Sequence, residues 1–106
     1  MNFKVIVIMK DVLDISVVIP TFNRSNYIEK TIETISQQTR FPKEIIIVDD
    51  CSQDDTLKKI EAIKSRTDLL IKVIALKENK GACAARNIGV REAKGKWKSF
   101  ELSECY

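Results

Sequence analysis

The chain has 106 residues, of which 44% are hydrophobic and 31% are charged, and its formal net charge is +3. A chain of this length forms one domain, and its interspersed acidic and basic residues argue against the basic surface of a nucleic-acid-binding protein. It has no histidine, and its three cysteines (Cys51, Cys83 and Cys105) lie far apart, which excludes histidine-based triads and the usual zinc frameworks and favours reduced thiols.

Residues 1–14 precede the first strong strand pattern, and we expect them to be an amino-terminal extension. Their apolar run, residues 5–9, is far shorter than the roughly 20 residues that span a bilayer, and no small-residue cleavage site follows it. The sequence therefore predicts neither a transmembrane segment nor a signal peptide. We expect a cytoplasmic protein, with the inner face of the membrane as the alternative location.

The first strand is predicted over residues 15–19, a continuous β-branched run typical of a strand covered on both faces. We expect Pro20 to end it. A helix follows, and Asn26 and Glu29 have the spacing of a capping box. The buried stripe of this helix is expected to be Ile28, Ile32 and Ile35.

The next two units repeat this alternation of strand and helix. We expect a second strand over residues 44–48 after Pro42, and a second helix after the N-capping residues 52–56. A third strand is predicted over residues 69–76. The apolar face of the second helix is expected to be Leu57, Ile60 and Ile63.

A third helix is predicted over residues 82–93, opened by Gly81 and ended by Gly95. Its small residues would let it pack close to the sheet. The βαβαβα order predicts an α/β fold with a mostly parallel sheet, equivalent to a Rossmann-like mononucleotide-binding half-domain over residues 15–97.

Two adjacent carboxylates, Asp49 and Asp50, follow the second strand. Side chains alternate along a strand, so one could cap the next helix while the other faces the ligand-binding edge. The alternative is that both only cap and solvate the strand end. A nicotinamide cofactor is disfavoured because residues 20–25 contain no glycine, and a phosphoacceptor domain is disfavoured because residues 75–79 contain no aspartate.

Residues 79–87 combine a glycine with small residues at a predicted helix start, where backbone N–H groups suit an anion. Arg86 lies one turn into that helix and could pair with a phosphate or a base carbonyl. The alternative is an ordinary surface arginine.

Three segments in order, residues 16–24 (SVVIPTFNR), 46–52 (IIVDDCS) and 79–87 (NKGACAARN), resemble family 2 glycosyltransferases of the GT-A fold. The resemblance covers roughly residues 14–97. It implies a site for a nucleotide-sugar donor, UDP being the most expected type, with thymine or guanine as alternatives to uracil. It also implies a saccharide or lipid-linked acceptor and no nucleic-acid partner.

The resemblance implies roles for individual residues. The loop after the first strand would lie against the nucleotide, and Asp50 would accept a hydrogen bond from the base. Asn87 could also help to shape the base and phosphate site, or it could be a packing residue. The implied nucleotide-binding residues are Thr21, Phe22, Arg24, Asp50, Gly81 and Arg86.

The reaction implied by the resemblance is inverting transfer, in which an acceptor hydroxyl attacks the anomeric carbon and expels a nucleoside diphosphate. This family uses a divalent cation, Mg²⁺ or Mn²⁺, held by an Asp-x-Asp motif after a fourth strand. Residues 98–106 contain no such motif, and Glu101 and Glu104 are three apart and follow no hydrophobic strand. We therefore expect a divergent tail over residues 98–106, no metal site, and a first strand left as an apolar sheet edge.

The abrupt end of the resemblance favours an amino-terminal, truncated part of a glycosyltransferase for polysaccharide or glycolipid synthesis, inactive by itself. One alternative is a non-catalytic nucleotide-binding remnant. The other is a small α/β interaction domain without nucleotide affinity.

Overall fold

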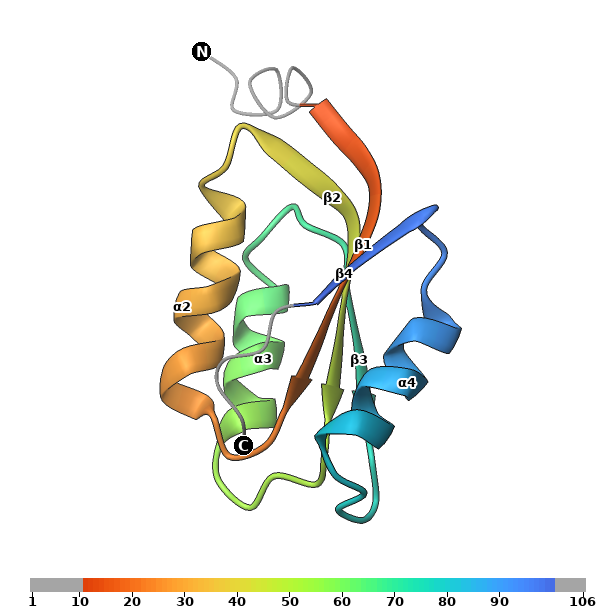
Figure 1. Cartoon of the computed structure of the whole chain (residues 1–106). Helices are drawn as coiled ribbons and strands as arrows, with labels where there is room; N and C mark the ends of the chain where they lie inside the picture. The colour runs from red at the N-terminus through yellow and green to blue at the C-terminus, as the bar shows by residue number, and fades with distance from the viewer. Residues whose placement is uncertain (1–10, 101–106) are drawn as a thin grey trace.

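The computed structural model describes residues 11–100, which form one four-stranded parallel sheet with helices on both faces (Figure 1). The strand order is β3-β2-β1-β4. Helices α2 and α3 lie on one side of the sheet and α4 on the other. In chain order the elements are β1 (Asp11–Thr21), α2 (Ser25–Ser36), β2 (Arg40–Asp49), α3 (Thr56–Lys64), β3 (Ile71–Ala75), α4 (Ala82–Glu92) and β4 (Trp97–Phe100).

The core has two parts because β2 is covered on both faces. Ile45 and Ile47 pack toward α2 and α3, and Ile46 and Val48 pack toward α4; all four are fully buried. The expected helix faces are confirmed, with Leu57 partly buried and the other residues buried: Ile28, Ile32, Ile35, Ile60 and Ile63. The α/β fold and its parallel sheet are therefore as predicted.

Two prolines lie inside strands, so the prediction that Pro20 ends the first strand is wrong. Pro20 pairs in register with Val48, and Pro42 lies in β2 opposite Leu13, beside a register shift in β1. The fixed φ of proline fits an extended strand, and the chain loses only one N–H donor there.

The predicted capping box is also wrong. Helix α2 begins at Ser25 with Arg24 as its cap residue, and no side chain caps it. The Glu29 carboxylate is instead 3.3 Å from the guanidinium of Arg66. The 37-residue separation between these two residues made this contact invisible to local patterns.

Strand β4 corrects the expectation of a missing fourth strand. Residues 97–100 pair in parallel with β1, from Ile15 opposite Trp97 to Val18 opposite Phe100, so β1 is not an edge over this stretch. All four β4 side chains are exposed, which explains why the sequence showed no apolar strand signal. Residues 11–14 and 98–100, assigned to the extension and the tail, belong to the sheet; Glu101 and Glu104 lie outside the described residues.

Helix α4 packs closely on the sheet, as its small residues predicted. A Cβ added at Gly89 would lie 2.4 Å from Cγ1 of Val18. Gly95 does not end the helix, which stops at Glu92. Gly95 is buried against Ser16, and a Cβ added at Gly95 would lie 2.6 Å from the Ser16 backbone nitrogen.

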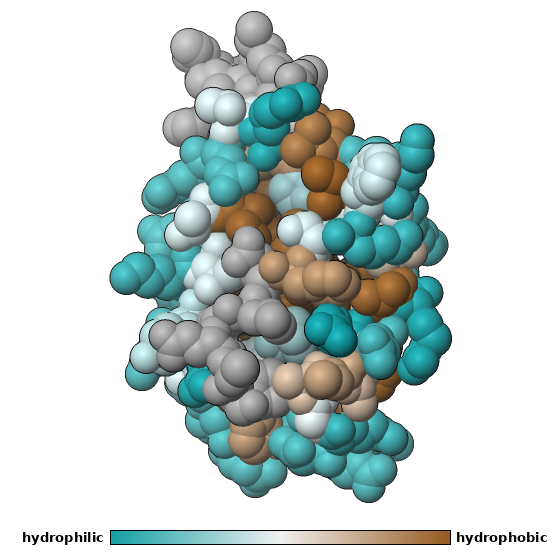
Figure 2. Space-filling model, in the orientation of Figure 1, coloured by the Kyte–Doolittle hydropathy of each residue, from teal (hydrophilic) through white to brown (hydrophobic). Residues whose placement is uncertain are grey.

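The surface over β1 and β4 is partly apolar, as the brown and tan side chains along the middle of the molecule show in Figure 2. A hollow of about 160 Å³ there is lined by residues of β1, α2, β2 and β4, including Ile15, Ile35 and Ser99. Among the described residues, no helix is both long and apolar enough to span a bilayer.

Candidate functional site

Most of the predicted site residues lie where β1, β2 and β3 end and the loops to α2, α3 and α4 begin, at the lower end of the sheet in Figure 1, and Arg86 lies one turn into α4. In the order β3-β2-β1-β4, the strands β2 and β3 lie on one side of β1 and β4 lies on the other. The point at which the strand order reverses is therefore between β1 and β4. Ligands of open α/β sheets bind outside the carboxyl ends of the strands at such a point. The topology therefore predicts a ligand-binding crevice beside the end of β1.

Asp50 fastens the loop before α4 to the end of β2. Its buried carboxylate accepts hydrogen bonds from the backbone N–H of Lys80 at 2.7 Å and of Gly81 at 2.9 Å. Its own N–H donates to the carbonyl of Thr21 at 2.8 Å. The structure thus brings Thr21, Asp50 and Gly81 together. An ionised carboxylate offers about four acceptor positions, so one further donor can still be accepted.

Asp49 points to the opposite face of the sheet, as strand alternation predicted. Its carboxylate accepts hydrogen bonds from the backbone N–H of Ser52 at 3.0 Å and from the Ser52 hydroxyl at 2.5 Å. The same hydroxyl accepts the N–H of Asn23 at 2.9 Å. Asp49 therefore closes the turn after β2 and ties it to the loop after β1.

Thr21 carries a buried hydroxyl that has no hydrogen-bond partner among residues 11–100. Alternation along β1 puts this side chain on the side of Val17 and Ile19, the face covered by α2 and α3. An unsatisfied buried hydroxyl costs on the order of 1–3 kcal/mol. Phe22, the next residue, is half-buried.

Arg24 and Arg86 are held in the same way, each over an aromatic ring. The guanidinium carbon of Arg24 lies 5.7 Å from the centroid of the Tyr27 ring, and that of Arg86 lies 5.6 Å from the Phe100 ring. Neither guanidinium has a hydrogen-bond or ion-pair partner among residues 11–100, so both keep their donors available for an anion. Asn87 is exposed, which rules out the packing role considered for it.

A cluster of metal ligands is the remaining feature to consider in the part of the chain that the structure describes. Residues 11–100 contain no cluster of three or more His, Cys, Asp or Glu side chains that could hold a metal ion.

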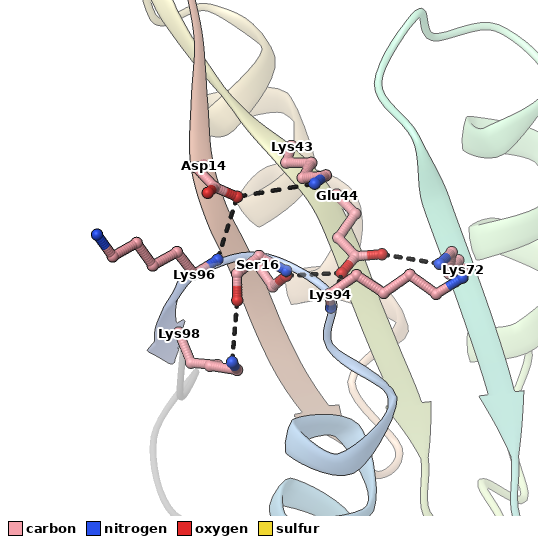
Figure 3. A network of polar contacts seen from close by, with 9 residues as sticks. Asp14, Ser16, Lys43, Glu44, Lys72, Lys94, Lys96 and Lys98 are labelled. Atoms are coloured by element: carbon pink, nitrogen blue, oxygen red, sulfur yellow. Dashed lines mark hydrogen bonds and ion pairs between the residues drawn. The ribbon is translucent and has the colours of Figure 1, made fainter.

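Sequence reasoning missed a buried polar network on the α4 side of the sheet, centred on Glu44 (Figure 3). One Glu44 oxygen accepts the Ser16 hydroxyl at 2.6 Å and the backbone N–H of Lys94 at 2.6 Å, and the other is 2.8 Å from Nζ of Lys72. The Ser16 hydroxyl in turn accepts the N–H of Gly95 at 2.7 Å. The only local signal was a polar residue on each of three neighbouring strands.

The network holds the Glu44 carboxyl in its charged form and fixes the entry to β4. Burial alone would raise its pKa, but the hydrogen bonds from Lys72, Lys94 and Ser16 outweigh burial and lower the pKa to about 2. A second carboxylate, Asp14, accepts the N–H of Lys96 at 3.1 Å. The turn from α4 to β4 is therefore bound to β1 and β2 by side-chain hydrogen bonds.

Comparisons with known proteins show the family of this chain. A family model described as Glycosyl transferase family 2 matches residues 16–100. A Bacillus subtilis (strain 168) protein named as a teichuronic acid biosynthesis glycosyltransferase, TuaG, is 40% identical over 89 residues, which cover 81% of this chain and 34% of that protein.

Solved structures of glycosyltransferases share the fold. Staphylococcus aureus TarS 1-349 in complex with UDP-GlcNAc superposes with a TM-score of 0.75 and 37% identity, covering 90% of this chain and 26% of that one. The mannosyltransferase PcManGT from Pyrobaculum calidifontis, in complex with GDP-Man and Mn²⁺, gives a TM-score of 0.69 and 26% identity, covering 78% and 25%.

The chain thus spans about a third or less of the length of these relatives. The family match covers residues 16–100, and the fold match to TarS covers 90% of this chain. The chain belongs to glycosyl transferase family 2 and has the GT-A fold.

Proposed function

We propose that this chain binds the nucleotide part of a UDP-type sugar donor in the crevice beside β1, as the donor-binding part of a glycosyltransferase. The observation that carries the proposal is the pair of guanidinium groups, Arg24 and Arg86, which have no anionic partner among residues 11–100, near the edge where Asp50 is buried. The diphosphate of such a donor carries the negative charge that guanidinium groups bind, because the guanidinium N–H donors fit the geometry of phosphate oxygens.

The remaining residues complete the proposed site. Asp50 accepts an N–H of the base with its remaining acceptor capacity, and Phe22 and Thr21 lie along the base. Gly81, whose φ is +95° and whose missing Cβ leaves open space, lets the diphosphate approach the backbone. The complexes of relatives with UDP-GlcNAc and GDP-Man support a nucleotide sugar as the ligand, and TarS favours uracil as the base.

The proposed reaction is inverting transfer of the sugar to a hydroxyl of a saccharide or lipid-linked acceptor, at the cytoplasmic side of the membrane. The Mn²⁺ in the PcManGT complex supports a divalent cation in this reaction, where it would neutralise the departing diphosphate. Residues 11–100 contain no cluster of three or more side chains that could hold it. For the chain by itself we propose donor binding without transfer.

Calorimetric titration of the 106-residue chain with UDP, UDP-GlcNAc, GDP and uridine tests the proposal. We expect UDP to bind more tightly than uridine, and Arg86→Gln to remove most of that difference. Lys58→Gln, on the exposed surface of α3, is the matched control for loss of one charge. Equal affinity for UDP and uridine would remove the diphosphate role, and no binding of any nucleotide would favour the interaction-domain alternative.

A transfer assay distinguishes donor binding alone from catalysed sugar transfer. Labelled UDP-GlcNAc is incubated with the chain, Mn²⁺ and a mixed saccharide acceptor, and the products are resolved. Binding without product supports a nucleotide-binding part that depends on other residues for catalysis. Metal-dependent product would overturn the proposal that these 106 residues do not transfer sugar.

A further inference from the structure

We propose that Phe100 is a positioning residue: its ring holds the Arg86 guanidinium at the β1/β4 crevice, ready for the diphosphate of the donor. This inference rests on the proposed function and adds to it a residue outside the nucleotide-binding set. It begins from the 5.6 Å distance between the Arg86 guanidinium carbon and the centre of the Phe100 ring.

The fold brings the two residues to the same face of the sheet. Phe100 pairs in register with Val18, and the Val18 side chain contacts α4 at Gly89, so Phe100 also faces α4. Arg86 lies one turn before Gly89 on that helix, which is the turn nearer the carboxyl edge of the sheet. The pair therefore connects α4 and β4 beside the predicted crevice.

The ring is the only partner of this guanidinium among residues 11–100, which accept none of its hydrogen bonds. Arg66, by contrast, forms an ion pair with the Glu29 carboxylate. A cation over an aromatic face is attracted without using its N–H donors. Phe100 thus restricts where the Arg86 side chain lies and leaves all five donors for phosphate oxygens.

Strand β4 offers a matched control. Trp97 is also exposed and aromatic and also has a cation over its ring, Nζ of Lys96 at 5.7 Å. It is three residues from Phe100 and therefore points to the opposite face of the sheet. Trp97→Leu removes the same kind of side chain from the same strand without touching Arg86.

The test follows the Arg86 Nε–H signal in ¹⁵N spectra of the full chain, assigned with Arg86→Lys. Phe100→Leu is expected to remove the ring-current shift of this signal, and Phe100→Tyr to keep it. The wild-type signal is then titrated with inorganic pyrophosphate, UDP and uridine. We expect Phe100→Leu to weaken pyrophosphate and UDP about twofold to fivefold and to leave uridine unchanged.

The controls separate positioning from loss of structure. Phe100→Tyr should restore the affinity, Trp97→Leu should leave it unchanged, and Phe100→Leu should have no further effect in an Arg86→Gln background. Equal weakening by Trp97→Leu, or unchanged pyrophosphate affinity in Phe100→Leu, would overturn the inference. So would a wild-type Arg86 signal that pyrophosphate does not move.

These outcomes distinguish the inference from the proposed function. If pyrophosphate moves the Arg86 signal and Phe100→Leu weakens this effect while UDP does not bind, the proposed function fails and the role of Phe100 stands. If UDP binds wild type and Phe100→Leu equally, the role of Phe100 fails and the proposed function stands.

Discussion

Glu44 and Ser16 lie opposite each other on neighbouring strands, and the Ser16 hydroxyl donates a 2.6 Å hydrogen bond to the Glu44 carboxylate. The same carboxylate oxygen also accepts the backbone N–H of Lys94, in the turn that leads into β4. Because all four β4 side chains are exposed, this polar contact and the backbone pairing to β1 place the strand.

Glu44→Gln should therefore destabilise the chain by about 2–4 kcal/mol. The neutral amide offers one acceptor oxygen instead of two, and it places an N–H₂ group against donors from Ser16, Lys94 and Lys72. Urea unfolding followed by circular dichroism measures the change. Glu33→Gln, at an exposed position of α2, should stay within about 0.5 kcal/mol of wild type; an equal loss in both variants would contradict the role of Glu44.

The stability of the chain should fall in acid between pH 4.5 and about 2. The Glu44 pKa is lowered from 4.5 to about 2 in the folded chain, so its stabilisation is fully present above pH 4.5 and is lost as the pH falls through this window. The loss is on the order of 3 kcal/mol. Asp54, whose lowered pKa reflects hydrogen bonds from Thr56 that outweigh burial, acts in the same direction.

Unfolding free energies measured from pH 2 to 7 for wild type and Glu44→Gln give the test. The curve of the variant should be flatter between pH 2 and 4.5. Parallel curves would assign the acid sensitivity to other carboxyls.

Gly95→Ala should cost more than Gly81→Ala, although both replace a glycine in a loop beside α4. A Cβ at Gly95 would meet the Ser16 backbone nitrogen at 2.6 Å and the Ser16 hydroxyl oxygen at 2.7 Å, whereas the space around Gly81 is open. We expect about 2–3 kcal/mol or more at Gly95 from overpacking, and about 1 kcal/mol at Gly81 from its positive φ alone. Thermal unfolding of the two variants compares them; the reverse order would contradict this account of the α4–β4 turn.

Thr21→Val should raise stability by about 1 kcal/mol, because it removes a buried hydroxyl that has no partner among residues 11–100 and keeps the shape of the side chain. Thr21→Ser, which keeps the hydroxyl and loses a methyl group, should lower stability. If Thr21→Val is destabilising, the hydroxyl makes a bond in solution, and a change in UDP affinity of the same variant would identify the ligand as its partner.

Much of the fold could be predicted because it depends on local patterns. Runs of β-branched residues predicted three parallel strands, and isoleucines at helical spacing predicted the buried faces of α2 and α3. Strand alternation predicted that Asp49 and Asp50 point to opposite faces, and the structure confirms it. The amino acids by themselves also carried the family resemblance, through segments at the ends of the strands.

Strand β4 and the Glu44 network could not be predicted in this way. The exposed side chains of β4 give no apolar signal, and the strand exists because β1 offers unpaired backbone groups beside it. The hydrogen bonds that fix it join residues 50 and 79 positions apart in the sequence.

The sequence by itself thus determined the α/β class, the helix faces and the residues at the carboxyl edge, because side-chain periodicity and strand-end chemistry are local properties. Only the tertiary structure decided which donors Asp50 binds, which ring holds Arg86 and where β4 lies. These depend on hydrogen bonds and ring contacts between segments that meet only when the sheet has formed.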